Sequence, residues 1–222
     1  MDDSQHAWVQ AEGVVLIAEQ LMLLLLDPER GELEVRRDAT DPDRLAAAAI
    51  LLDLAEQRNL GFRGGHVAFL ARFPSGHPVL TAAADVLRVA GPGLPMTSAL
   101  DLIETRVARV SRSLLEGLHR RDLLHRQRRP AWWPWAAWKY PLRSSQARNE
   151  ALAALRAGSS RGVLREYGLL LLIDCAGRLP GLLDAAAHTR AAAILLELGH
   201  HRPRMDATDA LLGAMRTALL DD

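Results

Sequence analysis

The sequence predicts a mainly α fold, a compact helical core wrapped by amphipathic helices and loops, with one or two small β-hairpins. The hydrophobic fraction of 49% can fill a core in a chain of 222 residues, and only 5% of residues are aromatic. Leu and Ala fill long stretches whereas runs of Val, Ile, Thr and Tyr are scarce, which favours helices over sheets. No repeat or low-complexity linker divides the chain, so we expect a single domain over residues 1–222.

In the first half of the chain, helices are predicted where apolar runs are bounded by Pro, Gly or Asp. They are expected at residues 7–26, 44–57 and 81–89. The first ends at the turn Asp27-Pro28-Glu29-Arg30-Gly31, and a brief strand is expected at residues 32–37. Glycines spaced through residues 59–78 predict turns with one or two short strands.

The clearest helix is predicted at residues 97–121. Apolar residues recur there with helical periodicity, at Ile103, Val107, Val110, Leu114 and Leu118. The opposite face carries Arg106, Arg109, Arg112 and Arg120. This face is either a solvated surface or a phosphate site, since guanidinium groups bind phosphate in a bidentate manner.

Beyond that helix, a hairpin is predicted at residues 126–142, followed by further Leu- and Ala-rich helices. These are expected at residues 145–157, 160–175, 182–198 and 207–219.

The charge balance and the cysteine content limit the function classes. The 27 basic and 27 acidic residues cancel, so any attraction to a membrane or to nucleic acid must come from local placement of charge. The single cysteine, Cys175, excludes an internal disulfide and is expected to be a buried thiol in a reducing compartment. The apolar run at residues 14–26 is too short to span a membrane, and the start of the sequence does not resemble a signal peptide. We expect a soluble cytoplasmic protein.

Motifs for catalysis, cofactors or metals are weak. His200 and His201 have no His-Glu-x-x-His or Cys-x-x-Cys partner, so no metal site is expected. A phosphate-binding P-loop needs a Lys after a Gly-rich loop, and Lys139 is the sole lysine and follows Trp138. We therefore expect no enzyme activity and no cofactor.

Residues 128–140 form the most unusual segment, with four of the five tryptophans beside basic residues. The candidate membrane contacts are Trp132, Trp133, Trp135, Trp138, Arg128, Arg129 and Lys139. Trp favours the membrane interface, and six basic residues without an acid between residues 123 and 149 could supply roughly 4–6 kcal/mol at an anionic leaflet. The alternatives are that the rings pack under the hairpin, against a second subunit or on nucleic acid.

Three segments taken together resemble the Golgi phosphoprotein 3 (GPP34) family. The first is the leucine run and turn at residues 21–31, followed by the Ala/Leu helix that ends at Arg58. The second is the arginine-bearing helix from Val110 through Asp122-Leu123-Leu124, with the hairpin that ends at Tyr140-Pro141-Leu142. The third is the helix pair around residues 169–176 and 191–198. The resemblance implies a helical core and no enzymatic activity. In eukaryotic members it further implies recognition of phosphatidylinositol 4-phosphate, with a hydrophobic hairpin touching the bilayer.

The family's headgroup residues, a Trp, an Arg and an Arg-x-x-Arg pair, match only in part. Val35 lies near the Trp position and alanines 46–49 lie near the first Arg position. Arg109 and Arg112 keep the Arg-x-x-Arg spacing, although a gapless alignment through Asp122-Leu123-Leu124 places Ala108 and Ser111 there. The resemblance implies that Arg36, Arg37 and Arg106 could join the headgroup site, with binding to anionic phospholipid in general.

We therefore expect a peripheral membrane protein on the cytoplasmic face of a membrane. The near absence of lysine favours a bacterial origin. One alternative is a protein-interaction module that uses the Trp-rich hairpin to contact a second copy or a protein client. The other is a winged-helix-like nucleic-acid binder, which the zero net charge disfavours.

Overall fold

The computed structural model describes residues 15–70, 76–128, 138–159, 163–199 and 207–220. Within them the chain forms ten helices and five short strands, which confirms the mainly α prediction. The helices are α1 (Ile17–Leu25), α2 (Pro42–Glu56), α3 (Pro78–Ala90), α4 (Met96–Arg106), α5 (Val110–Arg120), α6 (Ser145–Gly158), α7 (Leu164–Cys175), α8 (Leu179–Leu182), α9 (Ala185–Gly199) and α10 (Ala207–Leu220). The strands are β1 (Leu60–Arg63), β2 (His66–Phe69), β3 (Leu94–Pro95), β4 (Gln127–Arg128) and β5 (Trp138–Lys139).

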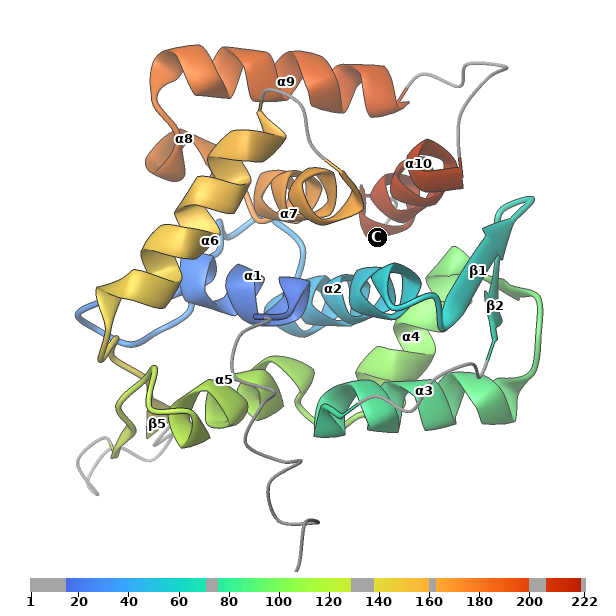
Figure 1. Cartoon of the computed structure of the whole chain (residues 1–222), viewed down its shortest axis with the longest axis horizontal. Coiled ribbons are helices and arrows are strands. Elements are labelled where there is room, and N and C mark those ends of the chain that lie inside the picture. The colour runs from blue at the N-terminus through green and yellow to red at the C-terminus, as the bar shows by residue number, and fades with distance from the viewer. Residues whose placement is uncertain (1–14, 71–75, 129–137, 160–162, 200–206, 221–222) are drawn as a thin grey trace, which may run out of the picture.

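The core lies around α1, α2 and α7. Every residue of α1 is buried, as are residues 44–54 of α2 and 168–173 of α7. Helices that are apolar on all sides must be covered by others. Figure 1 shows α1 and α2 in a middle layer, with α6, α7, α9 and α10 on one side and α3, α4 and α5 on the other.

The sequence signals for helix starts act as predicted at α2 and α6. Asp41 accepts a hydrogen bond from the backbone N–H of Asp43, and Pro42 occupies the first turn of α2. Ser144 accepts a hydrogen bond from the backbone N–H of Gln146 at the start of α6. Both helices therefore begin at residues with local capping chemistry.

Two small sheets confirm the predicted hairpins. Strands β1, β2 and β3 form an antiparallel sheet in that order, and Arg63 pairs with His66 across the Gly64-Gly65 turn. Strands β4 and β5 pair antiparallel, with Gln127 opposite Lys139, inside the predicted 126–142 hairpin.

Some predicted elements differ from the observed ones. The helix expected over residues 97–121 is two helices, because Arg109 adopts a left-handed conformation with φ 50°. Its apolar stripe is nevertheless buried throughout. The strand expected at residues 32–37 is reduced to an isolated bridge between Leu33 and Leu26.

Two further predicted helices have different bounds. The helix expected at residues 182–198 is the short α8 followed by α9, because Asp184 accepts the backbone N–H of Ala187 and starts a new helix. The helix expected at residues 7–26 is observed from Ile17, and residues 7–14 lie outside the described part of the chain.

Candidate functional site

Residues 27–31 form a turn that packs against the chain after β5. Gly31 has φ +67°, and a Cβ atom at this position would overlap the backbone nitrogen of Pro141. Only glycine fits such a close approach without strain. The backbone N–H of Tyr140 donates to the carbonyl of Gly31 at 2.8 Å. The turn therefore fixes the position of β5 relative to the start of the chain.

The base of the β4–β5 pair is held by aromatic and charged contacts. The guanidinium of Arg126 lies 3.8 Å from the ring centroid of Trp138, which is half-buried and packs against the core. Lys139 lies 3.1 Å from a carboxylate oxygen of Glu32. Arg128 is exposed. Trp138, the one member of the Trp cluster that the structure describes, thus packs partly against the core.

The other residues predicted for this membrane contact are Arg129, Trp132, Trp133 and Trp135. They lie outside the described residues, so their role stays a prediction from the sequence.

The predicted arginine face is divided by the break between α4 and α5. Arg106 ends α4 and Arg109 is the N-cap residue of α5, and both are exposed. Arg112 lies in the first turn of α5, with its Nε atom 3.0 Å from Glu116. This hydrogen bond raises the pKa of Arg112, against a smaller effect of desolvation. Arg109 and Arg112 therefore differ in environment, since Arg112 already has a carboxylate partner.

A carboxylate occupies the N-terminus of α5. Both the backbone N–H and the hydroxyl of Ser111 donate to Asp43 Oδ1, at 2.8 and 2.5 Å. A helix N-terminus attracts negative charge, and here Asp43 supplies it from α2. At the positions that a gapless alignment assigns to the family's arginine pair, this chain thus has the exposed Ala108 and a serine bonded to an acid.

The residues that the resemblance places near the family's Trp and first Arg are apolar, although Arg36 and Arg37 directly follow Val35. Residues 46–49 are fully buried alanines in α2, and Val35 is half-buried.

Arg36 and Arg37 lie side by side in the α1–α2 connection but have different partners. Arg36 forms a bidentate contact with Asp38, with Nε to Oδ1 at 2.6 Å and Nη2 to Oδ2 at 3.0 Å. Arg37 is exposed and makes no ion pair within the described residues. Of the two, Arg37 is the arginine free to bind an external anion.

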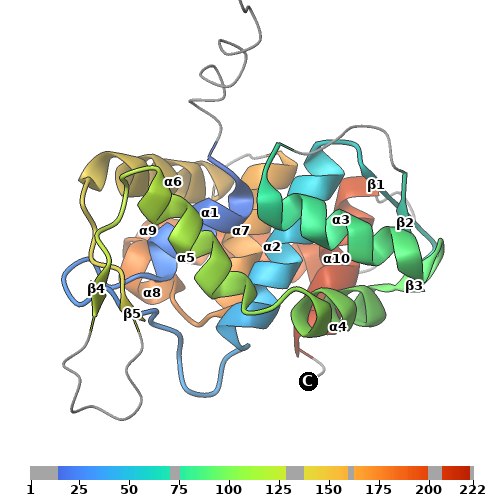
Figure 2. The ribbon, with the colours of Figure 1, turned by 90° about the horizontal axis from the view of Figure 1, so that it is seen from below.

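Four exposed arginines, Arg37 among them, have no acidic partner within the described residues, and we call them the basic edge. They are Arg37, Arg106, Arg109 and Arg128, none of which has a carboxylate partner in the described part of the chain. Figure 2 shows the α1–α2 connection and the β4–β5 pair projecting from the same edge of the molecule, with the α4–α5 junction towards it. The contact between Ser111 and Asp43 independently places the start of α5 beside the start of α2.

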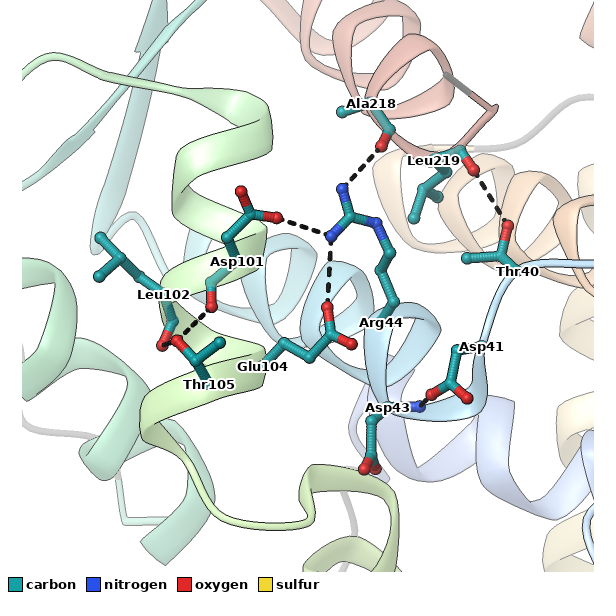
Figure 3. A network of polar contacts seen from close by, with 10 residues as sticks. All are labelled: Thr40, Asp41, Asp43, Arg44, Asp101, Leu102, Glu104, Thr105, Ala218 and Leu219. Atoms are coloured by element: carbon teal, nitrogen blue, oxygen red, sulfur yellow. Dashed lines mark hydrogen bonds and ion pairs between the residues drawn. The ribbon is translucent and has the colours of Figure 1, made fainter. Parts of the chain in front are cut away.

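Beside the basic edge lies a pocket of about 740 Å³ that the sequence did not predict. One of its lining residues is Arg44, which is only 6% exposed. Figure 3 shows its guanidinium between α4 and α10, where it donates to Asp101 at 2.7 Å, Glu104 at 3.2 Å and the carbonyl of Ala218 at 3.2 Å. A lone cation inside an Ala- and Leu-rich helix was the signal that could have revealed Arg44.

Neither a metal-binding cluster nor a membrane-spanning helix is found in the described segments. These segments contain no group of three or more His, Cys, Asp or Glu residues placed to hold a metal ion. None of their helices combines the length and apolar character needed to cross a bilayer.

Comparisons with known proteins agree with the resemblance seen in the sequence. Curated proteins give no match. The family model described as Golgi phosphoprotein 3 (GPP34) matches residues 17–219, nearly the whole chain. Taken with the helical core built on the leucine run of α1, this match shows that the chain belongs to the Golgi phosphoprotein 3 (GPP34) family.

Proposed function

We propose that the chain docks peripherally on the cytoplasmic face of a membrane by binding anionic phospholipid headgroups. The observation that supports this most directly is the basic edge, where Arg37, Arg106, Arg109 and Arg128 lack carboxylate partners in the described segments. Family membership suggests a Golgi-phosphoprotein-like role, and the family is not known for enzymatic activity.

Two of the acids nearest the basic edge are paired with arginines outside it, whereas Asp43 keeps its negative charge at the start of α5. Asp38 binds Arg36, Asp43 binds Ser111, and Glu104 binds Arg44. Each basic residue close to an anionic leaflet contributes about 1 kcal/mol, so four give roughly 4 kcal/mol before losses. Attraction of this size supports reversible docking that weakens as salt screens the charges.

The Trp-rich segment would add an apolar contact beside these charges. Trp132, Trp133 and Trp135 follow Arg128 in the sequence and combine an apolar ring with an N–H donor, as interfacial residues do. Selective binding of phosphatidylinositol 4-phosphate is not part of the proposal, since Val35 and the alanines at 46–49 stand near the family's Trp and Arg positions.

The proposal is tested by co-sedimentation with vesicles. The chain should pellet with vesicles of phosphatidylcholine plus phosphatidylglycerol at 50 mM salt, and should be released as salt rises towards 500 mM. A triple variant, Arg37→Gln, Arg106→Gln and Arg128→Gln, should lose most of the pelleting. Arg109 is left unchanged because it holds the left-handed backbone conformation before α5.

A matched control removes the same charge from other surfaces. Arg63 on β1, Arg156 on α6 and Arg190 on α9 are exposed, and their side chains have no ion pair within the described residues. Changing these three to Gln should leave pelleting within about twofold of the unchanged chain. Equal losses for the two triple variants would mean that net charge, and not the basic edge, controls binding.

The two alternative functions give different results in the same experiments. A protein-interaction module would form a concentration-dependent dimer or bind a client without pelleting with vesicles. A nucleic-acid binder would bind DNA with a steep salt dependence through the same arginines. Failure to pellet with anionic vesicles at low salt would reject the membrane proposal.

A further inference from the structure

The pocket beside the basic edge is built on the ends of two helices. The α1–α2 connection crosses them, with the backbone N–H of Arg36 donating to Ala176 O at 3.1 Å and that of Thr40 donating to Cys175 O at 3.3 Å. The hydroxyl of Thr40 donates to Leu219 O at 3.1 Å near the end of α10, as Figure 3 shows. These bonds hold the connection against the ends of the two helices and so shape the pocket.

Two ion pairs and one helix cap account for five of the charged residues that line the pocket, and two have no such partner among the described residues. The lining contains three arginines and four acids. Arg36 binds Asp38 and Arg44 binds Glu104, while Asp41 caps α2. The remaining two are Arg37 and Asp174.

Neither remaining residue has a hydrogen bond or ion pair from its side chain within the described part of the chain. Arg37 is exposed, and Asp174 is half-buried near the end of α7. Burial raises the pKa of the Asp174 carboxyl, and the positive charges of Arg216, His188 and Arg36 oppose that rise. A bound cation would stabilise the charged form of this acid in the same way.

The pocket suits neither a simple anion nor a simple cation. The carbonyl ends of α7 and α10 carry partial negative charge, and with Asp174 they oppose a bare anion. Arg37 opposes a ligand that carries only positive charge. A ligand that has one charge of each sign satisfies both residues.

Two of the exposed residues that line the pocket are apolar, beside the exposed charged residues of the α1–α2 connection. Pro180 is exposed and Leu220 is 57% exposed, and both line the pocket. A volume of about 740 Å³ is in the range of small-molecule sites. Unpaired charges of both signs, together with these two apolar groups, fit a phospholipid headgroup attached to its glycerol and acyl chains.

We propose that this pocket binds a phosphodiester headgroup with a primary ammonium, of the phosphatidylethanolamine type, with the phosphate at Arg37 and the ammonium at Asp174. This proposal rests on the proposed docking function in one respect, because docking on a membrane brings the lipid headgroup to the pocket. His188, which also lines the pocket, offers a ring nitrogen as a further partner for the ligand.

The chemistry of the pocket is tested first with a water-soluble probe, glycerophosphoethanolamine. Titration into the ¹⁵N-labelled chain should shift the amide signals of residues 36–40 and 174–177 in a saturable manner. Glycerol phosphate, which lacks the ammonium, and ethanolamine, which lacks the phosphate, should bind at least tenfold more weakly. Absence of saturable shifts up to 20 mM glycerophosphoethanolamine would overturn the proposal.

Two variants test the two assigned contacts. Asp174→Asn and Arg37→Gln should each weaken glycerophosphoethanolamine binding at least tenfold. Asp85→Asn and Arg156→Gln, which make the same chemical changes on the exposed faces of α3 and α6, should not change it. Arg37 is exposed and makes no contact that the fold requires, so its variant separates a binding defect from a folding defect. Unchanged affinity in either pocket variant would reject the corresponding contact.

Vesicles then identify the source of the headgroup and separate this proposal from docking. At a fixed fraction of phosphatidylglycerol, replacing phosphatidylcholine by phosphatidylethanolamine should increase pelleting several-fold, because a quaternary ammonium cannot donate N–H bonds to Asp174. Asp174→Asn should lose this increase and still pellet with phosphatidylglycerol. If the intact chain fails to pellet at all but binds the soluble probe, docking is rejected and the pocket is assigned to a free metabolite of the same chemistry.

Discussion

The carboxylate of Asp53 in α2 caps α1 by accepting the backbone N–H of Ile17 at 2.8 Å. Its second oxygen accepts the N–H of Ala18 at 3.0 Å, so two of the N–H groups left free at the start of α1 are satisfied. Asp53 is fully buried. Two central helices of the core are therefore joined by one acid.

The pH dependence of stability should report on Asp53. Burial raises the pKa of its carboxyl to about 7, against the opposing effect of the two backbone hydrogen bonds. In the unfolded chain this pKa is near 3.8, so between these values the folded state keeps a proton that the unfolded chain has released. The contribution of Asp53 to the free energy of unfolding therefore falls as pH rises from about 4 to about 7.

Urea denaturation of the unchanged chain and of Asp53→Asn between pH 5 and 8 tests this sign. The stability of the variant relative to the unchanged chain should rise with pH up to about 7 and then level off. A relative stability that falls with rising pH would mean that the hydrogen bonds outweigh desolvation and that the pKa of Asp53 is lowered.

A second prediction concerns the turn that packs against the chain after β5. Gly31→Ala combines a φ of +67° with overlap on Pro141, so it should lower the free energy of unfolding by at least about 2 kcal/mol. Gly64→Ala is the control, because Gly64 has φ +58° with nothing near its Cβ position and should lose only about 1 kcal/mol. Equal losses in chemical denaturation would show that contact with Pro141 is unimportant.

The Trp residues of the hairpin are predicted to divide into two groups. Trp138→Ala removes a half-buried ring stacked on Arg126 and should lower the free energy of unfolding by roughly 2 kcal/mol. The triple change of Trp132, Trp133 and Trp135 to Ala should reduce pelleting with anionic vesicles and leave stability nearly unchanged. A large loss of stability in the triple variant would support the packing or dimer interpretation for these residues instead.

The thiol of Cys175 should be unreactive in the folded protein. It is buried, as the sequence predicted, and burial raises its pKa to about 12. Because the thiolate is the reactive form, modification by iodoacetamide at pH 8 should be at least 100-fold slower in the native chain than in urea. Fast native labelling would show that the end of α7 opens readily.

Local features of the sequence predicted most of the helices. The caps at Asp41 and Ser144 started α2 and α6 as expected, and the apolar stripe from Ile103 to Leu118 is buried. The same stripe could not reveal the break at Arg109, because a turn between two helices can keep the same residues facing the core.

The candidate site was predicted less completely. The sequence named Arg37, Arg106, Arg109 and Arg128 among its site residues, and the structure shows them without acidic partners in its described part. The sequence could not show that Arg112 binds Glu116. Two opposite charges four residues apart on a helix can pair, but whether they do depends on which other groups lie beside them in the folded chain.

The sequence by itself determined the helical class, the buried leucine run, the turn at residues 27–31 and the isolated thiol, because these depend on residue type and on neighbours a few positions away. The tertiary structure alone decided which charges remain available. Asp43 reaches Ser111 across 68 positions and Arg44 reaches Asp101 across 57. Such pairs depend on how helices pack, so the pocket with its leftover Arg37 and Asp174 exists only once α2, α7 and α10 have come together.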